Sequence, residues 1–140
     1  MSQKFTLVGI IDDGSELDPS LPRSTATTLS FPKAADITID IEPFYPSGDP
    51  VPFATLDPSW KATMVIADLH RGRPRDPLQI AGVAATNENG AVIRFALKPT
   101  DTQFLTLQGY QFDAWITLLN LRYQMIQLSG IRLEAGLLAV

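Results

Sequence analysis

The sequence of 140 residues contains no cysteine and only one histidine. Without cysteine the chain has no disulfide, no thiolate nucleophile and no zinc–thiolate site. The lone imidazole of His70 also lacks the second histidine or the positioned serine that a zinc site or a nucleophilic triad requires. We therefore expect a protein without cofactor or metal that is not an enzyme.

Long hydrophobic runs and an excess of positive charge are missing as well. No apolar stretch approaches the ~18 residues of a membrane-spanning helix, and Met1–Lys4 does not resemble the start of a signal peptide. Acidic side chains number 15 against 11 basic ones, for a net charge of -4. This balance opposes attraction to phosphate groups, so we expect neither nucleic acid nor a membrane as the partner.

Helix-compatible sequence is scarce in the first half of the chain. Ten of the 11 prolines lie between Pro19 and Pro77. Because proline lacks a backbone donor and fixes φ, this half is expected to consist of short extended pieces and loops. The length suits one domain with its own hydrophobic core.

Alternation of apolar and polar residues defines most of the expected strands. Between Ile37 and Glu42, isoleucines alternate with polar side chains, which is typical of a strand with one buried face. Asn89-Gly90 suits the positive φ angles of a tight hairpin, whereas His70–Pro77 is expected to interrupt the strands as a loop. Seven to eight short strands predict an all-β, immunoglobulin-like antiparallel β-sandwich.

The same pattern divides the chain into three parts. Residues 1–34 contain one short apolar strand, Phe5–Ile11, followed by an extended arm. Residues 35–134 form the sandwich, and residues 135–140 are an apolar tail.

Four residues are expected to have structural roles. In the segment after Lys98, Thr100 or Asp101 is placed to cap a single helical turn. Tyr110, at the start of a core strand, is placed to bond back to upstream backbone as a corner tyrosine; an ordinary packed aromatic is the alternative. Trp60 and Trp115 are expected to pack within the sandwich.

Several segments carry a resemblance to a known family. They are the alternating strand at Ile37–Ile41, the strand Trp60–Ala67, the run Ala91–Leu97 leading into Thr100-Asp101-Thr102, the segment Gly109–Ile116 and the final Ile131–Gly136. Together, from about Ala35 to Glu134, they resemble the immunoglobulin-like N-terminal domain of phage baseplate upper proteins and similar small phage virion domains.

The resemblance implies a structural protein of a bacteriophage particle, made in the host cytoplasm and assembled in many copies with other virion proteins. The resemblance leaves the place in the particle open: a baseplate or tail, a neck, or a capsid surface, as in capsid decoration. The resemblance also implies a function through protein contacts without catalysis.

Two features are candidate protein-binding elements. Arg71, Arg73 and Arg75 form the strongest local positive charge, and guanidinium groups suit carboxylates on a partner; a solvated loop is the alternative. The apolar tail with Leu137 and Leu138, like the Phe5–Ile11 strand, is expected to dock on neighbouring subunits or to form edge strands within its own domain.

Other functions remain open at this point. Aromatic residues around the proline-rich loop (Phe44, Tyr45, Phe53 and Trp60) suit a carbohydrate-binding module, but they also suit the closure of one end of the core. The acidic turn at Asp12, Asp13, Glu16 and Asp18 departs from the spacing of a calcium loop, and a solvated turn is expected. A hydrolase on the same fold is the third alternative.

Overall fold

Alternating β-branched and polar residues form strands over most of the chain, as the sequence predicts. The computed structural model describes residues 2–11, 28–32, 35–51, 60–70, 73–88, 90–102, 109–118 and 121–134. These residues form eight strands and one helical turn, so the all-β class is confirmed. The elements are β1 (Ser2–Ile10), β2 (Thr28–Pro32), β3 (Asp36–Phe44), β4 (Lys61–His70), β5 (Arg73–Asn87), β6 (Gly90–Leu97), α1 (Pro99–Thr102), β7 (Gly109–Leu118) and β8 (Leu121–Glu134).

The eight strands form one curled sheet in the order β1-β3-β6-β5-β4-β7-β8-β2. From β3 to β8 every neighbouring pair is antiparallel. The two edge strands differ from this pattern, because β1 pairs in parallel with β3 and β2 pairs in parallel with β8. The sheet is therefore mixed at its edges. The expected N-terminal strand is present as β1, and the stretch assigned to an extended arm contains the second edge strand, β2.

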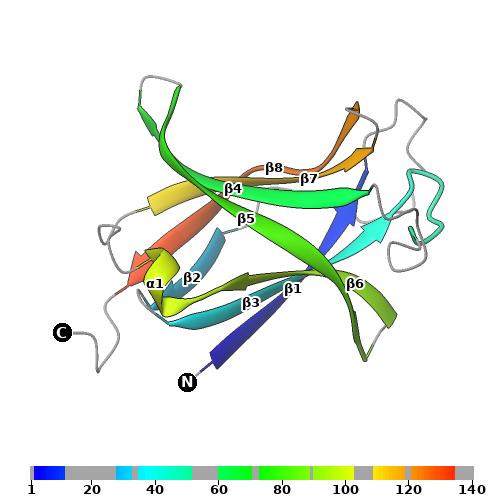
Figure 1. Cartoon of the computed structure of the whole chain (residues 1–140), viewed down its shortest axis with the longest axis horizontal. Helices are drawn as coiled ribbons and strands as arrows, with labels where there is room; N and C mark the ends of the chain where they lie inside the picture. The colour runs from blue at the N-terminus through cyan, green and yellow to red at the C-terminus, as the bar shows by residue number, and fades with distance from the viewer. Residues whose placement is uncertain are drawn as a thin grey trace.

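Strand β5 carries the sheet from one layer to the other. Its residues Arg73–Gly82 pair with β4, and its residues Val83–Asn87 pair with β6. Figure 1 shows β5 crossing obliquely between the layer of β4, β7 and β8 and the layer of β1, β3 and β6. One long strand thus replaces the loop that would otherwise connect two separate sheets.

Gly82 lies where β5 leaves β4 and approaches the side chains of β6. A Cβ atom at Gly82 would lie 2.8 Å from Ile93 Cγ2 and 2.8 Å from Phe95 Cε1. Both neighbours are fully buried. Glycine allows the strand to come this close to the core.

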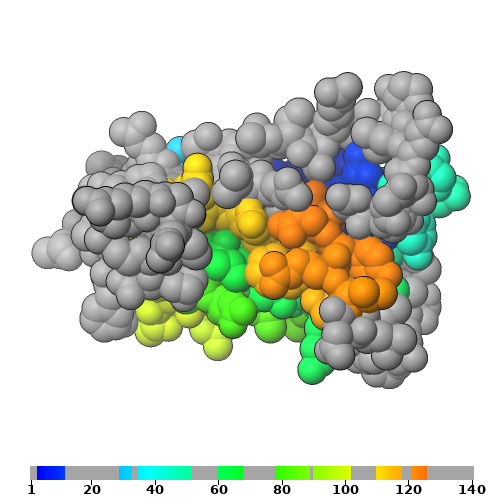
Figure 2. Space-filling model, turned by 90° about the horizontal axis from the view of Figure 1, so that it is seen from above, coloured from blue at the N-terminus to red at the C-terminus, as the bar shows by residue number. Residues whose placement is uncertain are grey.

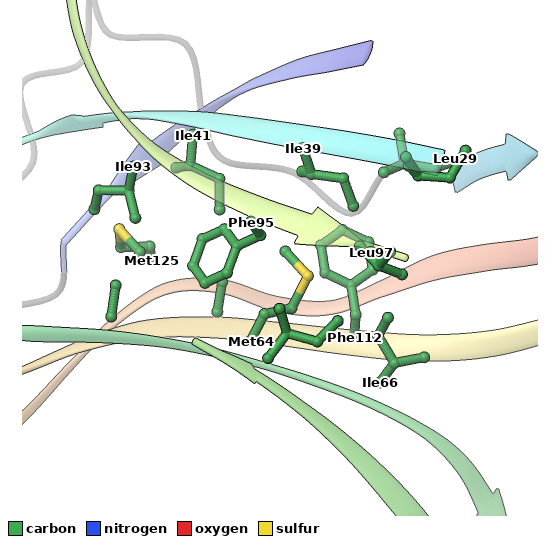
Figure 3. Close-up of a cluster of buried hydrophobic side chains, with 14 of the residues drawn as sticks. Leu29, Ile39, Ile41, Met64, Ile66, Ile93, Phe95, Leu97, Phe112 and Met125 are labelled. Atoms are coloured by element: carbon green, nitrogen blue, oxygen red, sulfur yellow. The ribbon is translucent and has the colours of Figure 1, made fainter. Parts of the chain in front are cut away.

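The core fills the space between the two layers (Figure 3). Ile39, Ile41 and Phe95 point from β3 and β6 toward Met64 of β4 and Phe112 of β7. Burial of these apolar side chains is the main source of the fold's stability. The buried cluster comprises Ile11, Leu29, Phe31, Ile37, Ile39, Ile41, Val51, Ala62, Met64, Ile66, Ile80, Ile93, Phe95, Leu97, Tyr110, Phe112, Ala114, Ile116 and Met125.

The hairpin expected at Asn89-Gly90 is present. Asn87 pairs with Gly90, and Gly90 has a φ of 121°. A second hairpin joins β7 to β8, with Leu118 paired to Leu121. Each of these connections places two consecutive strands side by side, as short loops require.

The loop expected at His70–Pro77 was wrong. Instead β4 continues to His70, β5 begins at Arg73, and these two residues pair with each other. A register shift between Ile66 and Asp68 adjusts the pairing. Pro74 and Pro77 are compatible with the strand because this part of β5 pairs on one side only, so no second neighbour needs their missing N–H groups.

Among the described residues, no helix has the length and the apolar character that crossing a membrane would require.

Candidate assembly site

The features that can engage another molecule are backbone edges and the outer faces of the two layers. Strands β1 and β2 each have one strand neighbour, since they end the sheet. The first part of β5, Arg73–Gly82, also pairs on one side only within the described residues. Unpaired N–H and C=O groups along such edges can pair with a further strand.

The edge strand β1 is held by charge as well as by backbone pairing. Asp40 lies on the outer face of β3 with its side chain fully covered. Arg94 of β6 donates to it twice, from Nε to Oδ1 at 2.9 Å and from Nη2 to Oδ2 at 3.1 Å. Lys4 of β1 places its Nζ 3.2 Å from Oδ2. This cluster of Lys4, Asp40 and Arg94 links three neighbouring strands.

The cluster keeps Asp40 ionised. Burial by itself would raise the pKa of Asp40, but the hydrogen bonds and positive charges of Arg94 and Lys4 outweigh it, so the pKa lies below its ordinary value. The same pairing raises the pKa of Arg94. The side chains of Lys4 and Arg94 are 48% and 33% exposed, so water solvates the outside of the cluster.

The two sheet edges approach each other through side chains. The rings of Phe5 on β1 and Phe31 on β2 lie 5.9 Å apart, tilted by 48°. Close to Gly9 of β1 lies Met125 of β8, since a Cβ at this glycine would meet Met125 Cβ at 3.1 Å. Both N-terminal strands thus pack within their own domain, the alternative to docking on a neighbour.

Figure 2 shows the outer face of the layer formed by β5, β4, β7 and β8. Trp115 belongs to this face, because its neighbours along β7, Ala114 and Ile116, belong to the buried core. Trp115 lies on β7 opposite Thr63 of β4 and Gln124 of β8. The guanidinium carbon of Arg122 lies 3.9 Å from the centre of the Trp115 ring, and only 8% of the tryptophan is exposed. A cation–π contact therefore covers this aromatic surface.

The arginines expected to form a basic loop lie elsewhere in the secondary structure. Arg73 and Arg75 belong to β5 and pair with His70 and Asp68 of β4. Arg71 lies outside the described residues. The role of these three arginines in binding a partner stays a prediction. Arg73 and Arg75 lie on a strand that pairs with β4, rather than on a loop.

Trp60, one of the aromatics considered for sugar stacking, is used by the core. Its ring stacks on Tyr123 with centroids 5.8 Å apart and an interplanar angle of 30°. Trp60, Tyr123 and Tyr45 all pack against the buried cluster. This arrangement favours closure of one end of the core over an open platform for a carbohydrate.

Asp101 stabilises the turn that follows β6. The backbone N–H of Lys98 donates to Asp101 Oδ2 at 2.7 Å, and the N–H of Asp101 donates to the Lys98 carbonyl at 2.9 Å. Pro99 occupies the first position of α1, where its missing N–H costs no bond. Asp101 therefore acts from inside the turn, like the third helical residue of a capping box, rather than as the capping residue itself.

Tyr110 is buried at the beginning of β7, opposite Ile131 of β8. The role of a corner tyrosine, in which its hydroxyl bonds to upstream backbone, stays a prediction, as does the alternative of an ordinary packed aromatic.

Comparison with models of known protein families gives no match. No curated protein matches the chain. The fold is similar to that of a phage protein domain. A solved structure described as the N-terminal domain of phage TP901-1 ORF48 superposes with a TM-score of 0.51 at 7% sequence identity. The match covers 94% of this chain and 98% of that one, so the likeness concerns the whole domain.

This likeness agrees with the resemblance inferred from sequence at the level of the fold. At such low identity, side chains on the surface carry no common signal, and the arrangement of strands is what the two domains share.

Several predicted sites lie outside the described residues. They are the acidic turn at Asp12, Asp13, Glu16 and Asp18, the aromatic Phe53, and the tail residues Leu137 and Leu138. Within the part of the chain that is described, no three His, Cys, Asp or Glu side chains gather in a group that could hold a metal ion.

Sequence reasoning missed two features of the surface. One feature is the cluster of Lys4, Asp40 and Arg94. The sequence shows Asp40 as a charge on the polar side of an alternating strand, but that Lys4 and Arg94 are its partners follows only from the strand order. The other feature is the open edge of β5, which overlaps a run without charged residues in the sequence, Leu78–Thr86. The pattern of this run alone does not show which strands lie beside it.

Proposed function

We propose that this chain is a structural component of a bacteriophage particle, acting through contacts with other virion proteins and without catalysing a reaction. The observation that supports it most directly is the likeness of fold, over 94% of this chain and 98% of the other, to the N-terminal domain of phage TP901-1 ORF48. The proposal covers a tail or baseplate, a neck and a capsid surface alike as the place of this chain in the particle.

The geometry supports a contact function. Backbone edges on β1, β2 and β5 offer pairing that depends little on side chains. The Lys4, Asp40 and Arg94 cluster fixes one of these edges in place. In a particle, repeated copies would each bury modest area, and symmetry would turn weak contacts into lasting attachment.

The composition of purified particles tests the proposal. Particles are produced from the genome that encodes this chain, banded in a density gradient and analysed by quantitative mass spectrometry. We expect the chain to band with the particles at a constant ratio to the major capsid protein. A matched preparation from a deletion strain controls for adsorbed host protein. Complete, infectious particles that lack the chain would contradict the proposal.

A further inference from the structure

One end of the layer formed by β5, β4, β7 and β8 carries two positive charges that have no acidic partner among the described residues. Lys61 of β4 pairs with Thr117 of β7, and Thr117 pairs in turn with Arg122 of β8. These residues form a cationic row (Lys61, Thr117 and Arg122) across the outer face of the layer (Figure 2). Lys61 and Arg122 are exposed, and neither forms an ion pair with another described side chain. Their charges are therefore available to a ligand.

Trp115 fixes the position of one of these charges. It is the next residue along β7 from Thr117 on the same face, and the guanidinium carbon of Arg122 lies 3.9 Å from the centre of its ring. At this distance an N–H group aimed at the ring would clash with it, so the guanidinium lies along the ring and its N–H donors stay at its rim. Because the ring already restricts the side chain, less entropy is lost when these donors bind an anion.

Two exposed large hydrophobic side chains flank the cationic row. Val83 is 59% exposed and Leu121 is 60% exposed. Val83 follows the pair formed by Ala62 and Gly82, so it lies beside the beginning of β4. Leu121 precedes Arg122 at the beginning of β8. Arginine and aromatic side chains next to exposed apolar groups are typical of protein interfaces.

An acidic protein segment is the occupant that this combination fits. Carboxylates accept two parallel hydrogen bonds from one guanidinium, and apolar side chains beside them would cover Val83 and Leu121. The phosphates of nucleic acid would also suit the two cations. They offer nothing to the two apolar side chains, however, and the net charge of -4 opposes the approach of a polyanion.

We infer that the cationic row, with Val83 and Leu121 at its two ends, is a docking surface for a segment of another protein that carries aspartate or glutamate beside apolar residues. Trp115 is a positioning residue, because it acts through Arg122. The surface binds through side chains, unlike the backbone edges of the sheet. The inference rests on the proposed function only where it takes the partner to be another virion protein.

An NMR titration of the isotope-labelled full chain with synthetic peptides tests the surface. The probe is a short peptide of glutamate, leucine and glycine, and its control has glutamine in place of every glutamate. We expect the probe to shift the signals of Thr117, Arg122 and the Trp115 indole while the Trp60 indole, which stacks on Tyr123, stays unchanged. The glutamine peptide should bind at least about tenfold more weakly.

Charge-removing variants assign the binding to the cationic row. Arg122→Gln should weaken binding of the glutamate peptide about tenfold or more. The matched control is Lys98→Gln, which removes the same charge from an exposed lysine that follows β6 in the other layer, and it should bind like the wild type. Because Arg122→Gln also uncovers Trp115, Lys61→Gln provides a second variant that leaves this stack intact, and it should weaken binding about threefold or more.

Four results would overturn the inference: no shifts with the glutamate peptide, shifts that map away from the cationic row, equal binding of the glutamine peptide, or equal losses for Arg122→Gln and Lys98→Gln. A titration with an oligothymidylate adds a fifth, since tighter binding of this strand would assign the surface to nucleic acid. These results are separate from the particle test. A chain that is present in particles but ignores the peptide would leave the proposed function standing while removing this surface.

Discussion

Replacing Gly82 with alanine should destabilise the fold at the point where β5 passes between the layers. The added Cβ would lie 2.8 Å from Ile93 Cγ2, 2.8 Å from Phe95 Cε1 and 2.9 Å from Phe95 Cζ. Carbon atoms pack best at about 3.5–4.0 Å, so these neighbours or the strand must move by roughly 0.7 Å or more. Both side chains are fully buried, which leaves them little room.

The expected cost combines two opposing effects. Overpacking of a well-packed core costs about 1–3 kcal/mol. Alanine also restricts the unfolded chain, which returns about 0.4–1 kcal/mol. The free energy of unfolding should therefore fall by about 1–2 kcal/mol, which for a chain of this length lowers Tm by roughly 3–8 °C.

Urea denaturation and calorimetry of the wild type and Gly82→Ala measure this loss. The urea midpoint should fall with an unchanged slope. Phe95→Leu removes ring atoms that the new Cβ would meet, so Gly82→Ala should cost less in that background than in the wild type. A Gly82→Ala protein as stable as the wild type, with no coupling to position 95, would refute the close approach of β5 to the core.

Two further predictions concern the sheet edges. Asp40→Asn should make the free energy of unfolding less dependent on pH in the acid range. Because the pKa of Asp40 is lowered on folding, its contribution to stability is complete above the ordinary value of 3.8 and is lost as pH falls through the folded-state pKa. Urea midpoints measured from pH 2 to 7 should therefore differ between the two proteins at neutral pH and converge at the acid end. Phe31→Ala should lower the free energy of unfolding by about 3–5 kcal/mol, because the ring is 1% exposed and packs against Phe5. The control Ser30→Ala, on the exposed side of β2, should change it by less than about 0.5 kcal/mol. Similar urea midpoints for these two variants would contradict the anchoring role of Phe31.

Much of the fold was predictable because its signals are local. The alternation in Ile37–Glu42 identified a half-buried strand, since successive side chains point to opposite faces. The hairpin at Asn89-Gly90 followed from the tolerance of glycine for positive φ. The prolines before Pro77 excluded long helices, but they also led to the loop expected at His70–Pro77, because local sequence does not show that this strand pairs on one side only.

The candidate site depended on information that the sequence does not contain. The cluster forms because β3, with Asp40, lies between β1, with Lys4, and β6, with Arg94. This strand order cannot be predicted from the spacing of the three residues along the chain. Trp60 and Trp115 both suggested packed aromatics, yet one closes the core against Tyr123 and the other lies on the outer face beneath Arg122.

The sequence by itself determined the class of secondary structure, the buried face of each regular strand and the absence of thiol chemistry, because each of these follows from residue type and from contacts a few positions apart. Only the tertiary structure decided which strands lie at the edges, which charges meet and which backbone groups stay open. Those properties depend on pairing between segments tens of residues apart, and that pairing is selected by burial of the whole core rather than by any local pattern.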